Sequence, residues 1–155
     1  MPTLSIARQT VTAQPALVVR SKAARHELPM VIGEGLGKVF PYALGAGLAI
    51  AGRPFARYLT MGPGLLTVEV GMPLASPAPG AEGLEAIVLP GGPAAVAVHA
   101  GPYDQLGETY AALERWIETN GLTIAGPPWE SYVTDPADHP NQDEWRTEVY
   151  WPLEK

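Results

Sequence analysis

Apolar residues recur with a helical period in two long stretches of the chain. In Pro29 to Ala46 and again in Asp104 to Asn120, an apolar residue returns to the same helical face every three or four positions. The two stripes are Ile32, Leu36, Val39 and Ala43, then Leu106, Tyr110, Leu113 and Ile117. The pattern predicts two amphipathic helices, each with one face against a core.

The sequence supports these two helices unequally. The first contains Gly33, Gly35, Gly37 and Pro41, each of which costs roughly 1 kcal/mol or more in a helix interior. We therefore expect a loose helix with a kink at Pro41. The second has charged residues on its outer face and ends at Gly121, which suits a left-handed cap.

Short stretches rich in alternating or β-branched residues predict the strands around these helices. The predicted strands include Thr3 to Arg8, Gln14 to Ser21, Leu84 to Leu89, Pro93 to Ala100, Thr67 to Leu74 and Arg146 to Leu153. A further strand follows each helix, after a Gly-x-Pro turn. Each half of the chain then has the order strand, helix, strand, strand.

The two halves are copies of one another. The stretch from Gly47 to Leu59 matches the stretch from Gly121 to Val133. The identical pairs are Gly47/Gly121, Leu48/Leu122, Ile50/Ile124, Ala51/Ala125, Gly52/Gly126, Pro54/Pro128 and Tyr58/Tyr132. The following strands also match, with Glu69 aligned to Glu148. Such a repeat indicates an internal duplication.

The duplication and the chain length predict one domain built from two related modules. A chain of 155 residues fits a single domain with its own core. We expect a first module over about 1–75, a linker over 76–83 and a second module over about 84–155. The predicted fold class is α+β, with an antiparallel sheet, two main helices and a pseudo-twofold axis between the modules.

Composition excludes several classes of function. The sequence has no cysteine, so disulfides and thiolate metal sites are ruled out. The net charge of −6 without a basic cluster argues against direct nucleic-acid binding and favours a cationic partner. No stretch predicts a signal peptide or a membrane span, so we expect a cytoplasmic protein. His139 lies among aspartates, a pattern commoner in solvated loops, and we expect neither a metal nor a cofactor.

The last two strands carry the candidate chemistry. Side chains alternate across a strand, so Glu130 and Tyr132 share a face, and so do Glu148 and Tyr150, while Trp129 faces away. If the strands pair as an antiparallel ribbon, we expect two carboxylates and two phenols on one side.

The first module holds Tyr58 and Glu69 at matching positions, and a pseudo-twofold axis would direct both sets toward one cleft. Carboxylates among aromatic rings favour a flat, apolar, cationic organic ligand. The simpler interpretation also stands, since glutamates on the open face of a half-covered sheet are often only solvated, and paired tyrosines also suit strand ends.

The stretch from His99 to Leu153 resembles a known family. Its motifs are Gly101 with Tyr103, Glu130 with Tyr132, and Thr147-Glu148 followed by Pro152. Together they resemble the GyrI-like small-molecule-binding domain, the effector-binding part of AraC-type and MerR-type multidrug regulators, which also occurs as a stand-alone protein. The resemblance implies two strand-helix-strand-strand modules in pseudo-twofold arrangement.

The resemblance also implies a site. In drug-binding members, acidic residues on the last two strands receive a cationic ligand among aromatic rings. By position these are Glu130, Glu148 and Tyr150, with Tyr132 nearby. Similar stand-alone members hydrolyse cyclopropane-bearing toxins with a glutamate and a tyrosine in the same cleft. By position, Glu148 would be the acid-base residue, and Tyr132 or Tyr150 would polarise the leaving carbonyl.

Three functions therefore stay open. The first is binding of an apolar, cationic or aromatic compound in a central cleft, and the second is toxin hydrolysis in that cleft. The third is inhibition of a partner protein such as gyrase, for which the acidic loop Asp135 to Glu144 is the distinctive surface. We expect no segment for direct DNA binding, and either a monomer or a dimer is compatible with the sequence.

Overall fold

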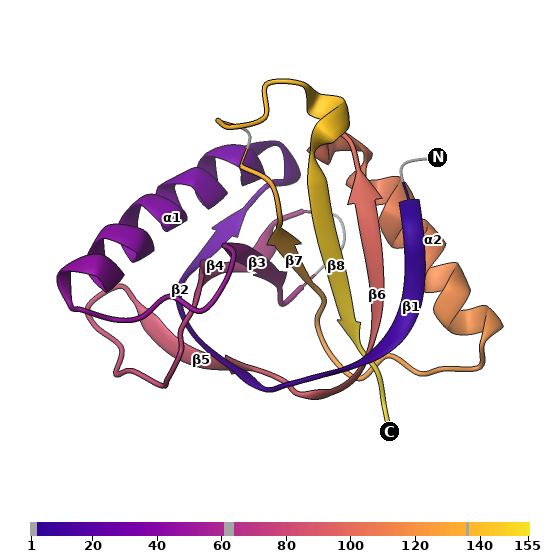
Figure 1. Ribbon diagram of the computed structural model, residues 1–155, viewed down its shortest axis with the longest axis horizontal. Coiled ribbons are helices and arrows are strands. Elements are labelled where there is room, and N and C mark those ends of the chain that lie inside the picture. The colour runs from indigo at the N-terminus through magenta and orange to yellow at the C-terminus, as the bar shows by residue number, and fades with distance from the viewer. Residues whose placement is uncertain (1–2, 61–63, 136) are drawn as a thin grey trace. The chain divides into compact units, whose positions relative to one another are not determined.

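The computed structural model describes residues 3–60, 64–135 and 137–155 (Figure 1). It is an α+β protein of antiparallel strands with two main helices, as the sequence predicts. In chain order the elements are β1 (Thr3–Val11), β2 (Gln14–Ala23), α1 (Leu28–Gly45), β3 (Phe55–Tyr58), β4 (Leu66–Pro73), β5 (Glu85–Leu89), β6 (Gly92–Ala100), α2 (Leu106–Thr119), β7 (Trp129–Tyr132) and β8 (Arg146–Pro152). Among the residues so described, no helix is both long and apolar enough to cross a membrane.

The chain forms two compact units, which we name by their helices. The α1 unit comprises Ala13–Pro90 and has the strand order β3-β4-β2-β5. The α2 unit comprises Met1–Thr12 with Gly91–Lys155 and has the order β1-β6-β8-β7. Within the units, α1 lies against β2 and β4, and α2 lies against β1 and β6 (Figure 1).

Each unit takes its edge strand from the sequence of the other half. Strand β1 runs into β2 through Thr12 and Ala13, yet it pairs with β6. Likewise β5 runs into β6 but pairs with β2. A two-residue hairpin needs positive φ in its turn, and Thr12, Ala13 and Pro90 are poorly suited to that geometry. The modules expected from the sequence, about 1–75 and about 84–155, group β1 with β2 and β5 with β6. In the structure, β1 pairs with β6 and β5 pairs with β2.

The duplication extends to single hydrogen bonds. A glycine with positive φ follows the C-cap residue of each helix, with φ of 71° at Gly47 and 67° at Gly121, so the predicted left-handed cap at Gly121 is confirmed. The residue after each glycine donates to the helix, from Leu48 N to Ala43 O at 2.9 Å and from Leu122 N to Ile117 O at 3.0 Å. This arrangement is the Schellman motif in both copies.

Each helix covers a core on one face of its own sheet. In the α1 unit the buried cluster is Leu17, Val19, Val39, Met72, Leu74 and Leu84. In the α2 unit it is Ala95, Ala97, Leu106, Leu113, Ile117, Val149, Trp151 and Leu153. Both predicted helical stripes contribute, and α1 continues as a helix through Pro41.

Replacing Leu113 with alanine is expected to lower the free energy of unfolding by about 2–5 kcal/mol. Leu113 is fully buried beneath α2, so the truncation removes apolar contact and leaves a cavity. Denaturant titration measures the change. Glu114→Ala, at the exposed neighbouring position, is the control and should stay within about 0.5 kcal/mol of the parent. Equal stability of the two variants would mean that the assignment of the helix face is wrong.

Candidate functional site

The register of β7 and β8 separates the residues that the sequence placed on one face. Glu130 lies opposite Val149, and Tyr132 lies opposite Thr147. Directly opposed residues of an antiparallel pair share a face. Glu130 and Tyr132 therefore lie on the face of the sheet that α2 covers. The prediction that they share a face with Glu148 and Tyr150 is wrong, because sequence alternation does not set the register between two strands.

The face toward α2 holds a buried carboxylate between two phenols. Glu130 is 4% exposed and accepts hydrogen bonds from Tyr110 Oη and Tyr132 Oη, both at 2.8 Å. Tyr103 makes an edge contact with Tyr132, with ring centroids 5.6 Å apart. Burial, aided by the charges of Asp135 and Glu130, raises the pKa of Tyr103. Glu130 thus has two satisfied acceptor atoms in a closed setting.

The opposite face of the same sheet carries a second carboxylate beside aromatic rings. Tyr150 Oη donates to Glu148 Oε1 at 3.0 Å. The ring of Trp129 stacks on the ring of Tyr150, with centroids 5.3 Å apart and planes 9° from parallel. Burial, followed by the charge and the hydrogen bond of Glu148, raises the pKa of Tyr150 to about 12. Trp129 was predicted to face away from Tyr150, and the register brings it into this cluster.

The equivalent carboxylate of the α1 unit is paired with two arginines. Glu69 is fully buried, and its Oε1 accepts from Arg57 Nε at 2.8 Å and lies 2.7 Å from Arg57 Nη2. Its Oε2 lies 2.8 Å from Arg20 Nη2, which also contacts Glu85 at 2.9 Å. Arginine and glutamate thus alternate across the four strands of this unit, in the order Arg57, Glu69, Arg20 and Glu85. The two arginines provide the positive charge that a buried carboxylate needs beside it.

The two copies differ at the positions that supply these arginines. Arg20 and Arg57 flank Glu69 on the neighbouring strands β2 and β3. In the α2 unit, Val98 and Ser131 flank Glu148 in the same register. Ion pairs in the described part of the chain involve Glu69 and Glu85, and none of them involves Glu148. Glu148 is therefore a carboxylate without the paired arginines of its duplicate Glu69.

The remaining predicted residues lie elsewhere. Tyr58 is buried opposite Val68, on the face of the α1 unit that faces away from Glu69. In the acidic loop, Pro136 lies outside the described residues, and Trp145 Nε1 donates to His139 O at 2.6 Å. Among the residues with described positions, no group of three His, Asp or Glu side chains is arranged to hold a metal ion.

The duplicated α+β fold is matched by a family of small-molecule-binding domains. The chain belongs to the family of the GyrI-like small molecule binding domain, whose model matches residues 24–154. No curated protein matches the sequence at a significant level.

Solved structures confirm the fold. The C-terminal domain of EcmrR is 24% identical, with a TM-score of 0.87 over 100% of this chain and 99% of that one. A hydrolase encoded by lin2189 from Listeria innocua is 15% identical, with a TM-score of 0.68 over 99% and 93%. SAV2435 bound to tetraphenylphosphonium is 10% identical, with a TM-score of 0.59 over 97% and 94%.

Tyr150 is expected to titrate well above an ordinary tyrosine. A pKa raised from 10.0 to about 12 favours the neutral phenol in the folded state. Its stabilising contribution is complete below pH 10 and is lost as the pH rises through about 12. Phenolate absorbance, compared between the parent and Tyr150→Phe, measures this titration. Glu148→Gln should lower the pKa of Tyr150, and an ordinary pKa in the parent would contradict the described contact.

Proposed function

We propose that the α2 unit binds a flat, apolar organic cation at Glu148, with the stacked rings of Trp129 and Tyr150 beside it. The difference between the two copies carries this proposal. The same position of the sheet holds a carboxylate in both units, and among the described residues it is paired with arginines in the α1 unit alone. At Glu148, a cationic ligand takes the place of the missing arginines.

The chemistry of the Glu148 cluster selects such a ligand. A carboxylate shielded from water is costly without a partner of opposite charge, so neutralisation by a ligand is favourable. Aromatic rings attract cations, which adds roughly 0.5–1 kcal/mol at an exposed site and about 2 kcal/mol when the cation is desolvated, and they also stack on flat groups. The net charge of −6 favours the approach of a cation and disfavours anions. The complex of SAV2435 with tetraphenylphosphonium, an apolar organic cation of tetrahedral shape, supports the apolar and cationic character of the ligand.

Glu148 is a better candidate than Glu130. Two tyrosines already donate to the two oxygen atoms of Glu130, which is only 4% exposed. Glu148 is half-buried, and a single phenol donates to one of its oxygens. A ligand can therefore neutralise Glu148 without breaking a closed hydrogen-bond arrangement.

Hydrolysis of a strained electrophile, such as a cyclopropane-bearing toxin, is the second candidate function. The fold shared with the lin2189 hydrolase and the contact between Tyr150 and Glu148 favour it. In this case Glu148 would act on a water molecule while Tyr150 would polarise the leaving group. Tyr132 is less suited to this role, since its hydroxyl donates to Glu130 on the other face. Substrate turnover that Tyr150→Phe abolishes, with dye binding intact, would distinguish hydrolysis from binding alone.

Glu148→Gln is expected to weaken the binding of a cationic dye such as a rhodamine by about 1–3 kcal/mol, or roughly 5- to 150-fold. The substitution keeps the shape of the side chain and removes its charge. Fluorescence titration measures the affinity, with neutral and anionic analogues alongside the cationic dye. Glu118→Gln, on the exposed face of α2, removes the same charge elsewhere and should leave the affinity unchanged. Equal binding by both variants would remove Glu148 from the site.

A further inference from the structure

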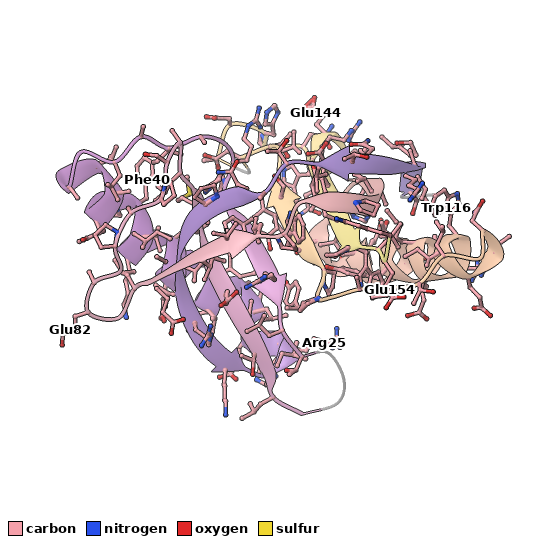
Figure 2. The ribbon with its side chains drawn as sticks, turned by 90° about the horizontal axis from the view of Figure 1, so that it is seen from below. Arg25, Phe40, Glu82, Trp116, Glu144 and Glu154 are labelled. Atoms are coloured by element: carbon pink, nitrogen blue, oxygen red, sulfur yellow. The ribbon has the colours of Figure 1, made fainter. Side chains whose placement is uncertain are left out.

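The outer face of α1 is apolar and exposed to solvent. Met30, Phe40 and Leu44 are 55%, 44% and 59% exposed (Figure 2 labels Phe40 on this helix). The helix carries only two charged residues, Glu34 and Lys38. Its duplicate α2 is an internal comparison, because it turns Glu108, Glu114, Arg115 and Glu118 to solvent. An exposed apolar face on only one of the two duplicated helices indicates an interaction site for another molecule.

Two glycines let another chain approach this face closely. A Cβ atom added to Gly33 or Gly37 would meet nothing within 4 Å, although both glycines lie inside the helix. Gly35, by contrast, has a packing role inside the unit, where an added Cβ would lie 3.0 Å from Val70. Gly33 and Gly37 weaken the helix, and no described residue would be crowded by a side chain at either position. They do provide a smooth surface on which a second helix can pack at short range.

We propose that the outer face of α1 binds the same face of a second copy of this chain, with the two helices antiparallel about a twofold axis. The two charged residues identify this occupant. Glu34 and Lys38 lie one turn apart on one flank of the face, and reversing the second helix places each Glu34 beside Lys38 of the partner subunit. The charges are then complementary in both directions, as a self-complementary interface requires.

The same arrangement brings the apolar ends of the helices together. Reversal directs Met30 toward Phe40 and Leu44 of the partner subunit, while Gly33 and Gly37 lie near the crossing. A contact made by one helix from each copy is small, toward the low end of about 1,200 Å² for specific complexes. The expected dimer is therefore weak, with a dissociation constant in the micromolar range. The dimer uses the outer face of α1, whereas the proposed ligand site uses the α2 unit.

Sedimentation equilibrium between about 1 µM and about 1 mM tests the dimer with a charge-swap series. The parent should pass from monomer to dimer within this range. Lys38→Glu and Glu34→Lys, made singly, place like charges opposite each other and should each raise the dissociation constant at least about tenfold. The double variant Glu34→Lys/Lys38→Glu restores both pairs and should dimerise like the parent.

Gly37→Ala supplies an independent readout. The added methyl group lies in open space in the monomer and improves helix propensity, so the melting temperature of the dilute protein should rise by a few degrees. In the dimer the same methyl group separates the helices and should weaken association. A parent that stays monomeric throughout would overturn the proposal. The proposal would also be overturned if the dissociation constant of the dimer did not change in these variants. The same holds if the double charge swap failed to restore it.

Discussion

Charge compensation of a carboxylate on an inner strand is the constraint on which this structure and its proposed function depend. Each unit places a glutamate at the same position of its four-stranded sheet, Glu69 on β4 and Glu148 on β8. Burial makes an unpaired carboxylate expensive, so a positive charge is favoured beside each one. The α1 unit supplies that charge from its own arginines. Among the described residues the α2 unit pairs no cation with Glu148, and the proposed ligand binding rests on this difference between the two copies.

The duplication also explains how the scaffold keeps the two positions equivalent. Helix caps, glycine conformations and hydrogen bonds beyond the helices recur in both units. The edge strands are exchanged between the halves of the sequence, so neither half encodes a complete sheet. Each unit therefore contains one strand from the other half of the sequence, although the side chains of the two units differ. At this position the α1 unit has a salt-bridge ladder, and the α2 unit has Glu148 beside Trp129 and Tyr150.

Local features were predictable from the sequence, and pairing between distant strands was not. The helical stripes, the cap at Gly121 and the shared face of Glu148 and Tyr150 follow from periods within one segment. The loop between β7 and β8 hides their register, so Glu130 was placed on the wrong face and Trp129 was overlooked. The sequence did not predict that β1 pairs with β6 and β5 with β2, because strands that are neighbours in sequence normally pair with each other. Aligning Arg20 and Arg57 with Val98 and Ser131 could have revealed the uncompensated carboxylate from the sequence alone.

The most direct test of this account transfers the missing charge from one copy to the other. Ser131→Arg places an arginine beside Glu148, where the duplicate has Arg57 beside Glu69. The measurement is the affinity of the folded variant for a cationic dye. Internal neutralisation of Glu148 predicts at least about a tenfold loss of affinity, because the arginine competes with the ligand for one carboxylate. Unchanged cationic dye affinity in the folded variant would contradict the account.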